Sequence, residues 1–447
     1  MGSVGRGDGA GTALRRVVSG RLLFLFILGD VLGAGIYALV GEIAGEAGGA
    51  IWVPMLVALL LAMLTAASYA ELVTKYPRAG GSAVFAERAF RRPVVSFLVG
   101  YCMLAAGVTS AAGLSLAFAG DYLAVFLDVP AVPAALVFLL LVALLNARGI
   151  QESVRANVVM TVIEVSGLLL VVVLGAIVLG RGEGDVGRVV QFPEGVSAGS
   201  AVLAAAILAY YSFVGFEVSA NVAEEVKDVS RVYPRALFGA LLVAGVVYVL
   251  VGLAASIVLP AEELSASSGP LLAVVQASGV GVPDWLFSFV ALVAVANGAL
   301  LTMIMASRMV FGLAEQRLLP PALGRVLPGR RTPWVAIAVT TVVAMALTLV
   351  GDLGALANIV VLLLLLVFLS TNVAVLVLRR DRVGHDHFTA PVILPVLAIG
   401  SCLLLLYQQE GRTWLFAGVM LLVGVGLYFL ARAPWWRGGR EPSTPGE

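Results

Sequence analysis

Long apolar segments recur along almost the whole chain, and they constrain its fold more than any other feature. A helix needs about 20 apolar residues to cross the hydrocarbon core of a bilayer. The sequence contains twelve segments of this kind, one of them rather short. The pattern therefore predicts an all-α integral membrane protein with twelve transmembrane helices.

Composition agrees with this assignment. The chain of 447 residues is 61% hydrophobic and only 12% charged, whereas about 25% of an ordinary soluble protein is charged. The predicted spans are residues 22–46, 51–75, 93–126, 133–147, 154–180, 199–225, 235–259, 283–316, 333–350, 354–378, 390–407 and 412–431. An ordinary soluble fold is excluded.

The basic residues predict an orientation. If the N-terminus is cytoplasmic, 25 of the 28 lysines and arginines fall in cytoplasmic segments, and Arg181, Arg188 and Arg412 remain outside. Positively charged loops stay on the cytoplasmic side of a plasma membrane, so both termini are expected inside. Residues 1–21 and 432–447 are then disordered cytoplasmic tails. The first of these resembles the start of a signal peptide, but the apolar stretch after it is too long for one.

Several classes of function lack the residues they need. The net charge of +1 provides no field for binding nucleic acid. Two cysteines and two histidines, the latter in one short polar stretch, are too few for a disulfide framework or a metal cluster. No cofactor is expected.

Two of the spans carry glycines near their middle. The stretch LGDVLGAGIYALVG contains Gly33 and Gly35, and YYSFVGFEVSAN contains Gly215. Unwound backbone at this depth is tolerable only where its polar groups line a cavity or meet a ligand. Close helix packing is the alternative, and for Gly29, Gly41 and Gly45 it is the favoured one.

The positions of these breaks suggest a repeat. If the broken spans are the first and the sixth, residues 22–180 and 199–378 each contribute five crossings and run in opposite directions. Inverted repeats with a midplane site between broken helices are typical of secondary transporters. Residues 390–431 would add two further helices.

Several stretches resemble one family of transporters. They are GAGIYALVGEIAGEAGG, SYAELVTKYPRAGGSAVFAERAF, FVGFEVSANVAEEVKDVSRVYPRAL, SASSGPL and ASRMVFGLAEQRLLP followed by RTPW, and together they cover most of residues 22–378. The chain resembles the amino acid–polyamine–organocation transporters, including their cationic amino acid branch. This resemblance implies a LeuT-like five-plus-five inverted-repeat core with two extra helices, and import or exchange of amino acids.

The same breaks predict a substrate site. The exposed amides of the first break, at the positive end of the outer half-helix, would receive the substrate carboxylate. They belong to Gly33, Ala34, Gly35 and Ile36. Carbonyls freed at the second break would accept from the substrate ammonium, and they belong to Tyr211, Ser212, Phe213 and Val214. The resemblance implies an aromatic gate, either Tyr211 or Phe213, although ordinary packing is the alternative for each.

Charged side chains inside the membrane are expensive and therefore mark functional candidates. Asp30, Glu164 and Glu217 are candidates for coupling or gating, whereas Glu71 and Arg308 favour a structural role near the inner helix ends. In the proton-coupled bacterial members of the family that the chain resembles, the fifth span commonly carries a lysine at this position. Glu164 departs from that pattern. A proton carrier, a cation ligand and a partner for a cationic substrate remain open for Glu164. A salt bridge to Arg308 or to another inward-facing arginine is the alternative for Asp30 and Glu164.

The sequence thus predicts secondary transport of amino acids or related amines, with a proton as the expected coupling ion. Exchange or uniport without proton coupling is the rival mechanism. The additional acidic residues inside the membrane slightly favour cationic amino acids or polyamines as the substrate. An enzyme or a channel is disfavoured, because the convergent acid, histidine or cysteine motifs and the polar rings they need are missing. The Gly/Ser-rich segment 260–282 is a candidate extracellular lid.

Overall fold

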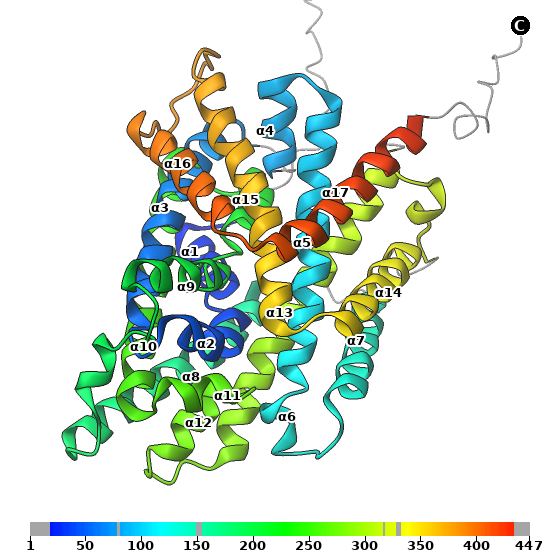
Figure 1. The fold of residues 1–447 in the computed structure, drawn as a ribbon. Coiled ribbons are helices and arrows are strands. Elements are labelled where there is room, and N and C mark those ends of the chain that lie inside the picture. The colour runs from blue at the N-terminus through cyan, green and yellow to red at the C-terminus, as the bar shows by residue number, and fades with distance from the viewer. Residues whose placement is uncertain (1–17, 78–80, 149–153, 316–317, 328–331, 433–447) are drawn as a thin grey trace, which may run out of the picture.

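The protein folds as a bundle of helices (Figure 1). The computed structural model describes residues 18–77, 81–148, 154–315, 318–327 and 332–432. The longer helices are α1 (Gly20–Val31), α2 (Ala34–Ala47), α3 (Trp52–Lys75), α5 (Pro93–Phe118), α7 (Ala131–Ala147), α8 (Val154–Gly180), α9 (Ala198–Ser212), α10 (Val229–Val258), α13 (Asp284–Glu315), α14 (Trp334–Val350), α15 (Leu353–Leu378), α16 (Ile393–Tyr407) and α17 (Gly411–Arg432). The shorter ones are α4 (Gly81–Phe90), α6 (Asp121–Ala124), α11 (Ala261–Ala266), α12 (Pro270–Ala277) and the 3-10 helices η1 (Val186–Val190), η2 (Phe216–Glu225) and η3 (Pro321–Gly324).

The described helices contain nine segments long and apolar enough to cross a membrane. Three of these segments each comprise two consecutive helices: α1 with α2, α5 with the short α6, and α9 with η2. Three shorter apolar helices, α7, α14 and α16, coincide with the other predicted spans. The all-α prediction is confirmed for the described residues. Twelve crossings and the inverted repeat stay predictions.

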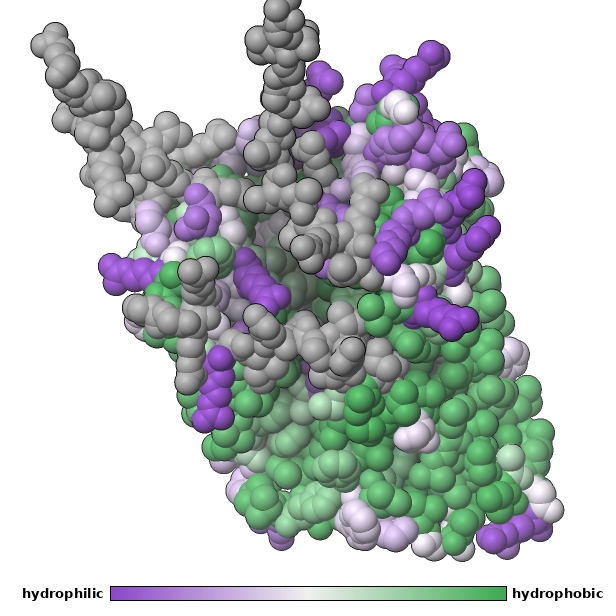
Figure 2. All heavy atoms as spheres, turned by 180° about the vertical axis from the view of Figure 1, so that it is seen from behind, coloured by the Kyte–Doolittle hydropathy of each residue, from purple (hydrophilic) through white to green (hydrophobic). Residues whose placement is uncertain are grey.

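The outer surface fits a bilayer. Hydrophobic side chains cover the flank in Figure 2, and hydrophilic ones gather mainly at the upper end and in smaller number at the lower edge. Exposed aliphatic residues include Leu144 on α7, Val162 on α8 and Leu422 on α17. Apolar patches of this extent on a protein surface mark contact with another apolar phase.

The interior is built around α5, which packs against α13 and α15 near the centre of the bundle (Figure 1). On one side α1 contacts α8 and α10, and α2 contacts α9. Small residues allow this close packing: a side chain at Gly29 would overlap the Thr161 hydroxyl of α8. Gly29 therefore serves close packing, as predicted.

The two chain ends differ from the predicted tails where they are described. The Val18 amide donates to the Glu225 carbonyl at 3.0 Å, and the Ser19 side chain caps α1. Residues 18–21 therefore belong to the folded body. Residues 1–17 and 433–447 of the predicted tails lie outside the described residues.

The segment predicted as a lid forms α11 and α12, which lie beside α2 (Figure 1). A Cβ atom on Gly41 of α2 would lie 2.5 Å from the Leu264 carbonyl oxygen, so α11 rests directly on this helix. Asp121 of α6 holds the connection between α11 and α12. Its Oδ2 accepts from the Ser267 hydroxyl at 2.9 Å and from the Gly269 amide at 3.1 Å.

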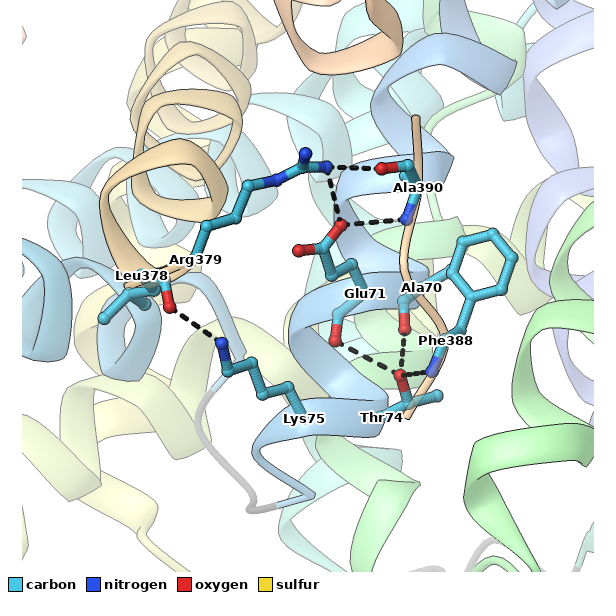
Figure 3. A network of polar contacts seen from close by, with 8 residues as sticks. All are labelled: Ala70, Glu71, Thr74, Lys75, Leu378, Arg379, Phe388 and Ala390. Atoms are coloured by element: carbon cyan, nitrogen blue, oxygen red, sulfur yellow. Dashed lines mark hydrogen bonds and ion pairs between the residues drawn. The ribbon is translucent and has the colours of Figure 1, made fainter. Parts of the chain in front are cut away.

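A polar clamp, formed by Glu71, Thr74 and Lys75 of α3 with residues 378–390, lies at one end of α3 (Figure 3). The Glu71 carboxylate lies 3.0 Å from the Arg379 guanidinium and accepts from the Ala390 amide at 2.9 Å. The Lys75 ammonium donates to the Leu378 carbonyl at 2.7 Å. Glu71 is thus a buried, ion-paired residue, which agrees with its predicted structural role.

Candidate functional site

The first span is interrupted at Leu32 and Gly33, between the end of α1 and the start of α2. The break at Gly33 was expected, but Gly35 lies inside α2 rather than in the unwound segment. Gly35 is needed for another reason. A Cβ atom at this position would lie 2.9 Å from the Cα atom of Ser212, so only glycine allows the two broken spans to approach this closely.

The second break separates α9 from η2 and comprises Phe213, Val214 and Gly215. Gly215 has a φ of +124°, a conformation that residues with a side chain rarely adopt. The Glu217 carboxylate folds back and accepts from the Gly215 amide at 3.0 Å. Glu217 therefore stabilises the turn itself.

The two breaks meet in the interior of the bundle. A Cβ atom on Gly215 would lie 2.9 Å from the Asp30 carbonyl oxygen, which belongs to the first broken span. Tyr248 of α10 joins the breaks from the other side: its hydroxyl lies 2.5 Å from the Val31 carbonyl oxygen and 3.0 Å from that of Ser212. Both carbonyls are orphaned by the end of a helix, so the tyrosine satisfies groups that would otherwise be costly to bury.

A cavity of about 690 Å³ adjoins the meeting point of the breaks. Its lining includes six of the eight predicted substrate-binding residues: Gly33, Ala34, Gly35, Tyr211, Ser212 and Val214. Ile36 and Phe213 do not line it, and both are fully buried. The Phe213 ring packs edge-on against Tyr248, whereas the Tyr211 hydroxyl faces Ser110 at 2.7 Å. Of the two gate candidates, only Tyr211 borders the cavity.

Polar backbone groups are available at both breaks. No side chain caps the start of α2, which leaves its first amides without an intrahelical partner. At the second break, the carbonyl of Tyr211 accepts from the Val214 amide at 3.0 Å, and that of Ser212 accepts from Tyr248. Among the described residues, no hydrogen bond reaches the carbonyls of Phe213 and Val214. The buried Ser212 hydroxyl also lacks a partner among these residues.

The remaining wall of the cavity is largely apolar. It is contributed by α5, α13 and α15, with side chains of Met103, Leu114, Leu301, Val360 and Leu364. Ser110, Asn297 and Thr302 add single polar groups. Such a cavity, apolar with few polar groups, is typical of a site for a small molecule.

The three predicted acids occupy different places. Asp30 and Glu217 line the cavity, whereas Glu164 lies behind its wall with none of its surface exposed. The Asn297 amide donates to Glu164 Oε1 at 3.0 Å, and Oε2 has no partner among the described residues. An amide rather than Arg308 is therefore the partner of Glu164. Arg308 is exposed and lines the cavity.

Comparison with known proteins identifies the family. The sequence profile of the amino acid permease family matches residues 21–433, almost the whole chain. The chain belongs to the amino acid permease family. This permease is a multi-pass membrane transporter, and the resemblance read from its motifs is confirmed.

Individual relatives are named for different substrates. The permease is 27% identical to a methylthioribose transporter and 26% identical to a branched-chain amino acid permease, both of Bacillus subtilis (strain 168). These matches cover 94% of this chain in both cases, and 94% and 93% of the relatives. A low-affinity putrescine importer of Escherichia coli (strain K12) is 26% identical over 83% of this chain and 84% of its own. Membership of the family thus leaves the substrate of this permease open.

Two residues of the site were missed or left unassigned by sequence reasoning. Tyr248 stands in an aliphatic span, GVVYVLVG, and its hydroxyl was the only signal that it has a polar partner. Asn297 was recognised as polar at a suitable depth but was given no role. Its contact with Glu164 joins residues 133 positions apart in sequence, which no local pattern reveals.

Proposed function

We propose that this permease is a secondary transporter that moves amino acids or related amines across the plasma membrane by alternating access. The proposal rests above all on one observation: the two helix breaks, with their unsatisfied backbone polar groups, meet beside a cavity in the interior of the bundle. Discontinuous helices with a substrate between them are typical of such transporters. The family and its transporter relatives support the same class of function.

We further propose an inverted-repeat core, with residues 22–180 and 199–378 as the repeats and residues 390–431 as two added helices. Each repeat begins with a span that is broken near its middle. With the N-terminus in the cytoplasm, the cavity extends from the breaks along the cytoplasmic halves of α1, η2 and α13. The residues that line this part include Gly29, Val218, Val222, Arg308 and Gly312. We infer that this conformation is open to the cytoplasm and closed on the outer side by α11 and α12.

The backbone at the breaks suggests how a substrate would be held. The amides at Gly33, Ala34 and Gly35 would receive a carboxylate, because the positive end of the α2 dipole points toward it. The ammonium would lie near the carbonyls of Phe213 and Val214. The Ser212 hydroxyl would supply a third polar contact.

The rest of the cavity wall determines which substrate side chains would be preferred. Met103, Leu114 and Leu301 favour an aliphatic or thioether side chain, since they offer no partner for a charge. A cationic substrate is the second candidate. It is favoured by Asp30 and Glu217, which line the cavity on the inner side of the breaks.

Glu164 and Glu217 are proposed as the groups that couple transport to protons. Glu164 suits this role because it is buried, is held at one oxygen by Asn297 and has a second oxygen without a partner among the described residues. Burial without a nearby cation makes the charged carboxylate unfavourable, so a carboxyl group in such surroundings tends to bind a proton. Exchange or uniport is the rival mechanism.

Transport by purified protein in proteoliposomes tests this proposal. Labelled leucine, methionine, lysine and putrescine would be offered with and without an inward proton gradient. We expect gradient-driven uptake of an amino acid, and we expect Glu164→Gln to reduce it to the level seen without a gradient. Glu262→Gln on the exposed face of α11 is the matched control and should transport normally. Uptake that ignores the gradient and survives Glu164→Gln would exclude the proton role of Glu164.

A further inference from the structure

A second hollow lies apart from the substrate cavity, between the first two turns of α1 and those of α10. It has a volume of about 560 Å³ and shares no lining residue with the cavity at the breaks. We call it the basic groove, defined by Arg21, Phe24 and Leu25 of α1 and by Val232 and Arg235 of α10. Nothing in the transport mechanism requires a hollow here.

Small residues keep the basic groove open. A Cβ atom on Gly20 would lie 3.3 Å from a methyl carbon of Val232, and one on Gly239 would lie 3.4 Å from the Phe24 ring. The first distance is tight for a single added carbon, and the second is already van der Waals contact. A larger side chain at Gly239 would therefore crowd the groove between the helices.

The rim of the groove carries two positive charges. Arg21 and Arg235 are both exposed, and no acidic residue lines the groove. The ion pairs of the described residues join Arg188 with Asp185 and Arg379 with Glu71, so neither groove arginine is engaged in one. The site is thus complementary to an anion.

The apolar side of the groove continues into the membrane. Leu242, Val246 and Leu250 follow Arg235 on the same face of α10, at intervals of one or two helical turns, and all three are exposed. Arg235 and Leu250 are 15 positions apart and therefore lie about 22 Å from each other along the helix, comparable with an extended acyl chain. A soluble anion would use the arginines but would leave this stripe unused.

We propose that the basic groove binds the headgroup of an anionic phospholipid from the cytoplasmic leaflet. Arg21 and Arg235 hold the phosphate, Phe24 and Val232 contact the glycerol region, and the acyl chains follow the apolar stripe of α10. Basic pockets between membrane helices at this level are suited to anionic headgroups. Because the groove joins α10 to the half-helix that precedes the first break, the lipid would stabilise the position of α1.

Native mass spectrometry of the full-length permease tests this proposal by comparing retained phosphatidylglycerol with phosphatidylcholine. We expect preferential retention of phosphatidylglycerol and a loss of about 25-fold in its affinity on Arg21→Gln with Arg235→Gln, since each arginine near anionic headgroups contributes a factor of about five. The matched control, Arg380→Gln with Arg382→Gln, removes two exposed arginines from a loop predicted to be cytoplasmic and should retain the lipid.

A charge-neutral variant separates binding from folding. Gly239→Leu fills the groove and should also weaken phosphatidylglycerol binding, while gel filtration shows an intact protein. Equal retention of the two lipids, an unchanged affinity in the double variant, or an equal loss in the control pair would overturn the proposal. Displacement of the lipid by soluble glycerol phosphate at matched concentration would also overturn it, because the site would then recognise a free phosphate.

Discussion

Single residues at the helix breaks connect backbone conformation with function. Position 215 requires glycine for two reasons. Its φ of +124° is unfavourable for any residue with a side chain, and a Cβ atom on Gly215 would lie 2.9 Å from the Asp30 carbonyl oxygen. Tyr248 completes the arrangement by satisfying carbonyls of both breaks. The cost of unwinding two helices in the interior is therefore offset by a few specific contacts.

Replacement of Gly215 by alanine should separate the breaks. We expect Gly215→Ala to lower stability by about 1–3 kcal/mol through backbone strain and to reduce transport strongly. Gly199→Ala is the control, because a Cβ atom at Gly199 in the same span meets nothing within 4 Å. Thermal unfolding in detergent and uptake in proteoliposomes provide the measurements. Wild-type values for Gly215→Ala would show that the turn tolerates a side chain.

At the scale of elements, contacts at the two ends of the bundle hold helices that are distant in sequence. The polar clamp ties α3 to the chain that follows α15, and Asp121 ties α6 to the connection between α11 and α12. Tyr76, just beyond α3, donates to Asp381 at 2.5 Å. Burial and the Asp381 carboxylate raise the pKa of Tyr76, so this hydroxyl keeps its proton and remains a donor.

The clamp should be important for stability. Glu71→Gln leaves the half-buried Arg379 guanidinium without its carboxylate, and breaking a buried pair in this way costs about 3 kcal/mol. We expect a clearly lower midpoint of thermal unfolding. Glu183→Gln, at an exposed residue with no ion pair among the described residues, should leave the midpoint unchanged. Equal midpoints for the two variants would contradict the role given to the clamp.

The closure over α2 should depend on Asp121. Asp121→Ala removes the acceptor for Ser267 and Gly269, which weakens the closure by about 2 kcal/mol. Amides of residues 261–277 should then exchange with deuterium about 30-fold faster. Asp128→Ala, at an exposed residue nearby in sequence, is the control. Unchanged exchange in Asp121→Ala would mean that packing on Gly41 alone keeps α11 and α12 in place.

At the scale of the whole molecule, the position of the cavity and the predicted orientation together indicate the side of the membrane from which a substrate would enter the cavity. The lining follows the halves of α1 and α13 that the charge distribution places toward the cytoplasm. The apolar surface and the charged end in Figure 2 fit the same orientation. The proposed state, open only to the cytoplasm, is a conformation that alternating access requires.

Thiol labelling tests the side of access directly. The native cysteines, Cys102 and Cys402, are both buried and should give little background. A membrane-impermeant reagent should label Met309→Cys, which lines the cavity, from the cytoplasmic side only. Ser197→Cys, before α9, should be labelled from outside. Labelling of Met309→Cys from outside would contradict the orientation or the open state.

Hydropathy and glycine placement were sufficient to predict much of this protein. The spans, the break at Gly33 and the break near Gly215 depend on segments of ten to thirty residues, about the length of a helix, so the local sequence determines them. The local pattern also marked Asp30, Glu164 and Glu217 as unusual acids. It could not distinguish glycines that unwind a helix from glycines that permit close contact, as Gly35 demonstrates.

Only the tertiary structure decided which of these residues meet. Glu164 contacts Asn297, and Glu71 contacts Arg379, which lies 308 positions further along the chain. Packing of distant helices brings these side chains together. The same packing places Phe213 against Tyr248, away from the cavity, and Tyr211 beside it. The sequence by itself determined the membrane helices and the family, since both follow from local patterns. The cavity and its polar partners were decided by contacts across the bundle.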